Sequence, residues 1–209
     1  WRGGISGRGG SLLGKTNRTG GIVEKDLASD FFLDGSTAVR VRHLRRGDLS
    51  ALEWEGEYTH FRRVYAFAYE RARRGRAVLW VAEADEGQGS GQLLGQLFVL
   101  LHSEANEELA DGRNSAFIHS FRVRPERRGR GLGSQLLYIA EQDLMERGFR
   151  RVYLNVAREN WRAVKLYERK GYQRIGKDPG IWSYVDHRGR QRHVHEPSWR
   201  MHKDLLSLD

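Results

Sequence analysis

The sequence predicts an α/β fold, and three segments carry this prediction. Residues 116–123 read Ala-Phe-Ile-His-Ser-Phe-Arg-Val, a β-branched and aromatic run that is typical of a strand. After the glycine-rich residues 128–133, leucines and alanines recur at four-residue steps up to about position 145, as they do on the buried face of a helix. A second strand and helix pattern occupies residues 151–172. Strands and helices that alternate in this way are typical of a sheet flanked by helices.

Residues 1–36 are predicted to form a glycine-rich arm ahead of one domain at 37–209. Residues 1–20 contain seven glycines together with serines and threonines, and they show no apolar period, which is typical of a flexible segment. Residues 9–16 satisfy the Walker A pattern of nucleotide-binding loops. No apolar strand precedes them and no periodic helix follows, so we interpret the pattern as part of the arm.

The domain is predicted to begin with a strand, two helices and a hairpin. Residues 37–44 alternate apolar and basic side chains, which indicates a half-exposed strand. Asp48 stands where a residue would cap a short helix, and residues 58–74 carry apolar side chains at helical spacing before a glycine. Residues 77–84 and 92–102 are two further strands around a glycine-rich turn, as in an antiparallel hairpin.

The segment 116–148 contains a strand, a turn and a helix. Because side chains alternate along a strand, four residues of this strand are expected on one face. They are Phe117, His119, Phe121 and Val123. Pro125 ends the strand, and Gly148 ends the helix of about 15 residues that follows the turn.

The turn at residues 128–133 is typical of a binding site for a bulky anion. Its three glycines let backbone N–H groups approach an anion closely, and the first turn of the next helix presents unpaired N–H donors. Arg128 and Arg130 add positive charge where the helix dipole already favours anions. The strand, turn and helix together therefore predict a cradle for a pyrophosphate.

Two ordered motifs of this chain resemble those of the GNAT superfamily of N-acyltransferases. Arg128-x-x-Gly131-x-Gly133 after such a strand resembles the family's acetyl-CoA signature. Residues 160–172 resemble its Asn-x-x-Ala-x-x-Leu-Tyr-x-x-x-Gly-Phe block, with tyrosine in the last place. The resemblance covers about residues 37–203 and implies a GNAT-type mixed, partly antiparallel central sheet flanked by helices, closed by strands at residues 181–186, 191–196 and 199–202.

The resemblance implies acetyl-CoA as the co-substrate and no metal. The strand at 117–123 would bind the pantetheine arm through its main chain, with the Phe121 N–H as donor to the carbonyl oxygen. Val123 would hold the arm, and Asn160 would bond it from the other side. The expected cofactor-binding residues are Phe121, Val123, Arg128, Gly129, Arg130, Gly131, Leu132, Gly133, Ser134 and Asn160.

The implied reaction is direct attack of an amine on the thioester, and the absence of cysteine excludes a cysteine acyl-enzyme. Tyr167 is the expected general acid, because a phenol stays protonated at neutral pH and can donate to the leaving thiolate; simple packing under the sheet is the alternative. His119 is the first candidate for the general base, although a lone strand histidine is often a packing residue. Glu83 is the next candidate, and Glu53 and Glu55 follow.

The acceptor is left open among a small-molecule amine, a peptide α-amine and a protein lysine. Bacterial GNAT members that acetylate protein N-termini resemble Leu-Glu-Val-Arg in the strand before the second block, whereas residues 154–157 here are Leu-Asn-Val-Ala. Asn155 cannot accept a proton near neutral pH, which disfavours the peptide α-amine. Basic residues at 188–195 suit an acidic acceptor group, but a solvated basic hairpin is the favoured interpretation.

The remaining expectations come from composition. The net charge of +9 is spread among 36 basic and 27 acidic residues, which favours a solvated surface over a nucleic-acid partner. No apolar run reaches membrane-spanning length and no signal-peptide pattern is present, so we expect no membrane partner and a cytoplasmic location. A homodimer is a mild preference. The alternative functions are a catalytically inactive acyl-CoA-binding sensor or partner-stabilising protein and, more remotely, a basic nucleic-acid module.

Overall fold

The computed structural model of the 209-residue chain describes residues 29–33, 37–84 and 91–205. Residues 29–33 are the only part of the predicted arm among them. The Walker A-like residues 9–16 and most of the glycine-rich hairpin turn lie outside the described residues. The division into an arm and a domain therefore stays a prediction.

The described chain alternates strands with three α-helices. In chain order the elements are β1 (Ser29–Leu33), β2 (Thr37–His43), α1 (Arg62–Arg73), β3 (Ala77–Ala84), β4 (Leu93–Leu100), β5 (Ser115–Val123), α2 (Leu132–Glu146), β6 (Arg151–Ala157), α3 (Trp161–Arg169), β7 (Gln173–Asp178), β8 (Ile181–Val185), β9 (Gln191–His195) and β10 (Ser198–Asp204). Short 3₁₀ turns are η1 (Arg46–Asp48), η2 (Ala51–Glu53), η3 (Thr59–Phe61) and η4 (Pro125–Arg127). None of the described helices is long and apolar enough to cross a membrane.

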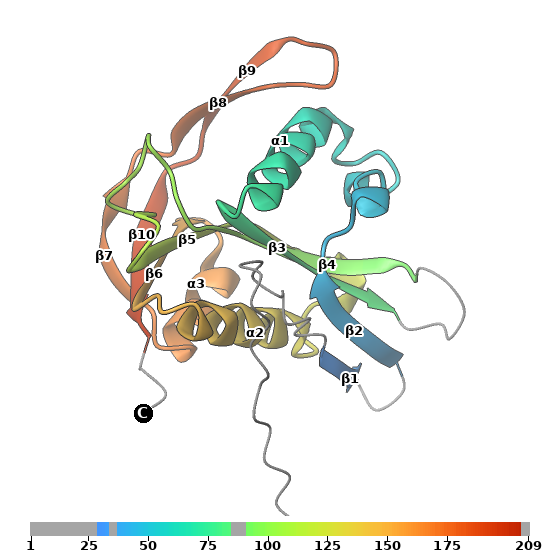
Figure 1. Cartoon of the computed structure of the whole chain (residues 1–209), viewed down its shortest axis with the longest axis horizontal. Helices are drawn as coiled ribbons and strands as arrows, with labels where there is room; N and C mark the ends of the chain where they lie inside the picture. Colours follow the sequence, from blue (N-terminus) through green and yellow to red (C-terminus); the bar gives the residue numbers. More distant parts are fainter. Residues whose placement is uncertain (1–28, 34–36, 85–90, 206–209) are drawn as a thin grey trace, which may run out of the picture.

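Eight strands form one mixed sheet in the order β1-β2-β3-β4-β5-β6-β10-β7. β5 and β6 are parallel, and the other neighbours are antiparallel. Helix α1 covers one face, and α2 and α3 cover the other (Figure 1). The predicted α/β class with a mixed, partly antiparallel sheet is therefore confirmed.

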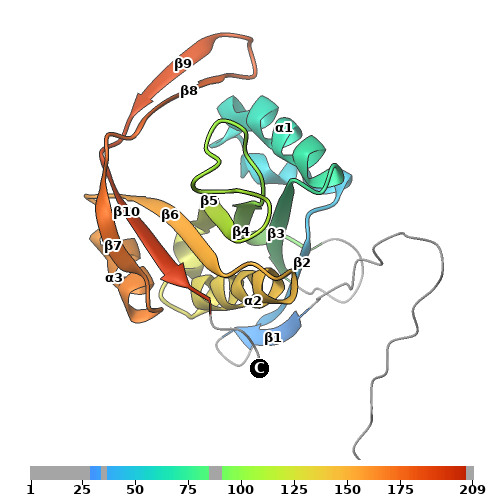
Figure 2. The ribbon, with the colours of Figure 1, turned by 60° about the vertical axis from the view of Figure 1, so that its left-hand side comes forward.

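Two parts of the strand prediction differ from the structure. Strands β1 and β7 were not predicted. β1 lies in the segment that was expected to be part of the arm. β7 reads Gln-Arg-Ile-Gly-Lys-Asp and has no apolar alternation, and its pairing with β10 makes it a strand. The expectation that the whole tail closes the central sheet is wrong for β8 and β9, which form a separate hairpin. This hairpin extends on the α1 side of the sheet (Figures 1 and 2).

In place of the short helix predicted after Asp48 there are two 3₁₀ turns, one that ends at Asp48 and one at Ala51–Glu53. Asp48 does not cap a following helix, because it is the last residue of the first turn and its side chain accepts a hydrogen bond from the Arg45 backbone N–H before that turn, at 2.7 Å; Ser50 precedes the second turn. Trp54 and Glu55 then take left-handed backbone angles, with φ of 43° and 55°, so a longer helix cannot continue through them. The helix predicted from residue 58 begins at Arg62, after the 3₁₀ turn Thr59–Phe61.

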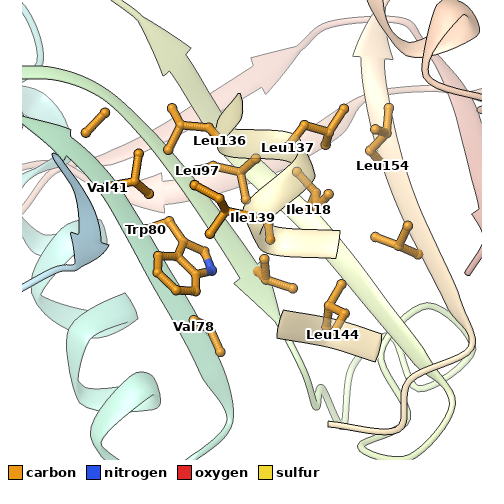
Figure 3. Close-up of a cluster of buried hydrophobic side chains, with 14 of the residues drawn as sticks. Val41, Val78, Trp80, Leu97, Ile118, Leu136, Leu137, Ile139, Leu144 and Leu154 are labelled. Carbon is orange, nitrogen blue, oxygen red and sulfur yellow. The ribbon is translucent and has the colours of Figure 1, made fainter. Parts of the chain in front are cut away.

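The central strands are buried on both faces, which explains their nearly continuous apolar sequences. On β3, Val78 and Trp80 face the larger core cluster beneath α2, whereas Leu79 and Val81 face the smaller cluster beneath α1. The larger cluster also contains Ile118 of β5 and several leucines of α2 (Figure 3). β5 therefore lies between two packed layers, and each of its side chains faces one of them.

Candidate active site

β5 and β6 separate at the centre of the sheet. They pair as parallel strands only as far as Ile118 and Leu154. Beyond that point β5 continues beside β4 to Val123, and β6 continues beside β10 to Ala157. Within the described residues, the main chain of residues 119–123 thus has no strand partner on its β6 side. Such unpaired backbone groups require hydrogen-bond partners, which a ligand can supply.

A β-bulge lies in β5 where the two strands separate. Between the pairs Arg122–Gln96 and His119–Phe98, β5 has two residues and β4 has one. Ser120 in this bulge takes a left-handed φ of 50°. The Gln96 side-chain amide donates a hydrogen bond to the Ser120 carbonyl oxygen at 3.1 Å and so holds the bulge in place.

The bulge overturns the expectation that four side chains of β5 share one face. Phe121 and Val123 pack against the core cluster beneath α2. His119 instead contacts Phe98 of the cluster beneath α1, with ring centroids 5.9 Å apart, and stacks with Phe117 at 6.5 Å. One extra residue in a strand shifts the alternation by one position, so the residues before and after it face opposite sides.

The glycine-rich turn leads from η4 into α2 with two residues in left-handed conformations. Gly129 has a φ of 76° and Gly131, which precedes the first helical residue, has a φ of 92°. A Cβ atom at either position would meet no other atom within 4 Å, so the space beside this backbone is open. The Arg128 Nε atom donates to the Val123 carbonyl oxygen at 2.9 Å and ties the turn to the end of β5. An exposed turn of this conformation at a helix N-terminus fits a bulky anion.

The start of α2 packs closely against β5 and α3. A Cβ atom at Gly133 would lie 3.4 Å from the Phe121 ring and 3.8 Å from Leu166. Leu132 is buried in the core, so what it offers an anion is its backbone N–H, and Ser134 is half-buried in the same first turn. The third glycine therefore allows the helix to approach the strand that carries Phe121.

Tyr167 lies on α3 beside this part of β5. Its ring centroid is 6.3 Å from that of Phe121 and 5.6 Å from that of Tyr172, and the residue is 7% exposed. Burial raises the pKa of the Tyr167 phenol well above its ordinary value, so the group is protonated at neutral pH. Among the described residues its hydroxyl has no hydrogen-bond partner, which leaves the proton free to be donated.

Asn160 is the residue that caps α3. Its Oδ1 atom accepts a hydrogen bond from the Ala163 backbone N–H at 3.1 Å, which satisfies a donor of the first helical turn. The side-chain carbonyl of this expected pantetheine-binding residue thus already has a structural partner. The side-chain NH₂ is the part left to donate to a ligand.

The Glu83 carboxylate is bound to an arginine, whereas a general base needs a free carboxylate. Both of its oxygens accept hydrogen bonds from the Arg42 guanidinium, at 2.9 and 2.5 Å, and Asp48 accepts two more from Arg42, at 2.6 and 3.1 Å. Arg42 is 2% exposed, so the three side chains form a buried ion triad. Burial alone would raise the pKa of Asp48, but its hydrogen bonds with Arg42 lower it below its usual range.

The two more distant carboxylate candidates are also paired with arginines. Glu53 accepts from Arg62 at 2.5 and 2.8 Å, and Glu55 accepts from Arg124 at 2.8 and 2.9 Å. The hydrogen bond from Arg62 lowers the pKa of Glu53, and the hydrogen bond from Arg124 lowers that of Glu55. Both groups hold an arginine in place and are weak proton acceptors.

His119 is half-buried on the α1 side of β5. Burial lowers its pKa to about 4, and the positive charges of Arg71 and Arg122 add to this effect. Its Nδ1 atom lies 3.1 Å from the Ser120 hydroxyl. The imidazole is therefore neutral at pH 7 and can accept a proton, although only as a weak base.

An aromatic wall on the α1 side was not predicted from the sequence. We use this name for Tyr58, Phe61, Trp182 and Tyr184. Phe61 lies 4.8 Å from Tyr184 and 6.2 Å from Trp182, measured between ring centroids. The Arg122 guanidinium lies over Tyr58 at 4.1 Å and over Phe61 at 5.0 Å. These residues come from the η3 region, β5 and β8, so no local pattern marks them.

The described residues contain no group of three or more His, Asp and Glu side chains placed to hold a metal ion. The groups that the structure does gather are main-chain donors, a protonated phenol, a neutral imidazole and an arginine beside aromatic rings.

A family model described as "Acetyltransferase (GNAT) family" matches residues 41–172. Among curated proteins, mycothiol acetyltransferase of Cellulomonas flavigena is 37% identical over 90 residues, which are 42% of this chain and 26% of the relative. Mycothiol acetyltransferase of Corynebacterium aurimucosum is 42% identical over 59 residues, 28% of this chain and 19% of the relative. The chain thus matches about a quarter or less of the length of these relatives.

Solved structures show the same fold at low sequence identity. The ribosomal-protein-S18-alanine N-acetyltransferase of Escherichia coli is 18% identical with a TM-score of 0.58, over 82% of this chain and 96% of that one. The spermidine/spermine N-acetyltransferase SpeG of Vibrio cholerae is 22% identical with a TM-score of 0.57, over 80% and 92%. NAA60 of Arabidopsis thaliana, solved in complex with acetyl-CoA, is 20% identical with a TM-score of 0.57, over 80% and 98%.

Proposed function

We propose that this chain, which belongs to the GNAT acetyltransferase family, transfers an acetyl group from acetyl-CoA to an amine by direct attack in a ternary complex. The observation that carries the proposal is the separation of β5 from β6 beside the glycine-rich turn and Tyr167. In this arrangement, main-chain hydrogen-bond donors, an anion-binding turn and a proton donor lie beside the same end of β5. The cysteine-free chain also suits a reaction without a cysteine acyl-enzyme.

The donor is held by main-chain groups on the α2 side of the sheet. Acetyl-CoA supplies an activated acyl carbonyl and a thiolate leaving group. The N–H groups of residues 128–134 and the two arginines of the turn take its pyrophosphate, and the main chain of Val123 and the Asn160 side-chain NH₂ hold its arm. The Phe121 N–H donates to the carbonyl oxygen, where negative charge increases during attack.

The acceptor approaches from the opposite face of the sheet. Phe121 and Val123 face α2, whereas His119 and Arg122 contact groups beneath α1. An amine on the α1 side can therefore reach the carbonyl carbon where the strands separate, without displacing the donor. Two reactants that are bound at once on opposite faces need no covalent enzyme intermediate.

The environments of Tyr167 and His119 suit them to the two proton transfers of the proposed reaction. As the new C–N bond forms and the C–S bond breaks, Tyr167 gives its proton to the sulfur, and its raised pKa keeps that proton available at neutral pH. The amine gives a proton to neutral His119 or to water on the α1 side, and this proton passes to solvent. Solvent then returns a proton to Tyr167.

The test is an amine-library screen with acetyl-CoA that measures thiol release and product mass. We expect acetylated products, and we expect Tyr167→Phe to lower kcat by about 100-fold or more while CoA binding, measured by calorimetry, is unchanged. Tyr138→Phe, on the exposed side of α2, is the matched control and should behave as wild type. Binding of CoA without acetylation of any amine would instead support an acyl-CoA sensor. No detectable binding of CoA would refute the whole assignment.

A further inference from the structure

We propose that Arg122 and the aromatic wall form the acceptor subsite, and that the acceptor is an amine that also carries a carboxylate and an aromatic body. This inference rests on the proposed acetyl transfer and adds the chemical class of its acceptor. It depends on three observations, namely the charge of Arg122, the aromatic rings beside it and the position of Arg122 on β5.

Arg122 is a cation without a carboxylate partner in the described part of the chain. Its Nη1 atom donates to the Tyr65 hydroxyl at 2.5 Å, and its guanidinium stacks on Tyr58 and Phe61. Of the nearby carboxylates, Glu53 and Glu55 are each bound to a different arginine, and the Glu57 carboxylate interacts with the Tyr58 hydroxyl. A half-buried arginine with one neutral hydrogen bond keeps several N–H donors for an anion, and a planar carboxylate matches its geometry.

The aromatic wall offers a stacking surface next to this charge. Trp182 is 42% exposed, and Trp182 and Tyr184 lie two residues apart on β8, so both rings face Phe61. The hairpin that carries them is fixed at its turn by Asp186, which accepts hydrogen bonds from the backbone N–H groups of Arg188 and Arg190 and from the Arg192 side chain. Rings that are already held in place can bind a flat apolar group with little loss of conformational entropy.

The position of Arg122 connects this surface to the reaction. Arg122 follows Phe121, whose N–H we assign to the thioester carbonyl, and its side chain points to the α1 side. A carboxylate bound there holds the rest of the acceptor on the face from which the amine must attack. The same anion would offset one of the two positive charges that lower the pKa of His119, and this would make the imidazole a stronger base when the acceptor is present.

The experiment compares three amines that share one aromatic body. Phenylalanine carries a carboxylate, phenylalaninamide carries a neutral amide, and phenethylamine carries neither. A second pair, 4-(2-aminoethyl)benzoic acid and its amide, places the charge further from the amine. In at least one of the two sets, we expect kcat/KM to be about 10- to 100-fold higher for the carboxylate than for its amide, which is the range of one charged hydrogen bond.

Variants of this surface separate recognition from folding. Arg122→Met should abolish the preference, so that kcat/KM becomes equal for the carboxylate and its amide, whereas Arg122→Lys should keep part of the preference. Trp182→Ala should raise KM for all the aromatic amines by about 10-fold, and Ile181→Ala, at the exposed residue that precedes Trp182 on β8, is the matched control. A variant that merely unfolds would lower activity on acid and amide equally and would also lose CoA binding.

A ligand that cannot be acetylated keeps this inference distinct from the proposed function. 3-Phenylpropionate has the carboxylate and the ring but no amine, and calorimetry should detect its binding to wild type and not to Arg122→Met. If it binds while no amine is acetylated, the subsite stands and the proposed transfer fails. If amines are acetylated, acids and amides react equally in both sets, and 3-phenylpropionate does not bind, the subsite is wrong and the transferase assignment stands.

Discussion

The buried triad of Arg42, Asp48 and Glu83 offers a sharp test of a structural role against a catalytic one. In Glu83→Gln the side chain keeps its size but loses its charge. Its amide oxygen can still accept one hydrogen bond from Arg42, while its NH₂ group faces a guanidinium N–H and cannot accept. One of the two hydrogen bonds, at 2.9 or 2.5 Å, is therefore lost, and the other joins the charged guanidinium to a neutral amide oxygen in place of a carboxylate.

The size of this effect follows from the burial of Arg42. Removal of one partner of a buried ion pair costs about 3–5 kcal/mol. Asp48 still holds Arg42 through two hydrogen bonds, and one hydrogen bond to position 83 remains, so we expect a loss of about 2–3 kcal/mol in the free energy of unfolding. For a domain of this size, that loss corresponds to a Tm lower by about 5–10 °C.

Urea unfolding followed by tryptophan fluorescence measures the stability, and kcat is measured well below the unfolding midpoint with both substrates in excess. We expect kcat within about twofold of wild type, because a properly folded Glu83→Gln protein keeps its site. Glu104→Gln, at an exposed ion pair with Arg76, is the control and should lose less than about 1 kcal/mol. An unchanged stability with a 100-fold lower kcat would refute this reasoning and make Glu83 the general base.

Three further predictions concern the glycine-rich turn, His119 and the network beneath α2. Gly131→Ala should weaken CoA binding measured by calorimetry and cost about 1 kcal/mol of stability, since the φ of 92° strains any residue with a Cβ; unchanged binding would exclude the turn as the cradle. His119 has a folded pKa of about 4, below its unfolded value near 6.5, so the unfolded state binds more protons between these pH values and stability falls by about 2–3 kcal/mol as pH drops from 6.5 to 4. His119→Gln should remove that part of the pH dependence in urea unfolding, and an unaltered profile would show that the histidine is not desolvated. Tyr172→Phe removes the hydroxyl that donates to buried Glu141 at 3.0 Å and should cost about 1–2 kcal/mol, whereas no change in the urea midpoint would contradict a stabilising role for this bond.

Sequence patterns over short stretches predicted the strand, turn and helix at the centre of the candidate site. The strand at Ser115–Val123, the turn and the helix Leu132–Glu146 all follow from alternation, glycine positions and a four-residue period, and the structure places them within one or two residues of the expectation.

Features that depend on pairing between distant segments could not be predicted in this way. The bulge at Ser120 depends on the register with β4 and on a hydrogen bond from Gln96, 24 residues away in the chain. Glu83 looked available because its partner Arg42 lies on another strand, 41 residues away. Phe61 was interpreted as an ordinary core position of a helix, since the rings of β8 that meet it are more than a hundred residues further along the chain.

The bulge in β5 also has a consequence for redesign of the protein. Positions 119 and 122 face the side that we assign to the acceptor, and positions 121 and 123 face the side that we assign to the donor. A mutant library confined to positions 119 and 122 should therefore shift acceptor preference while CoA affinity stays constant. Deletion of Ser120 would leave one residue on each strand between the pairs His119–Phe98 and Arg122–Gln96, so regular alternation would keep the flanking side chains on their present faces and remove only the left-handed residue where the strands separate.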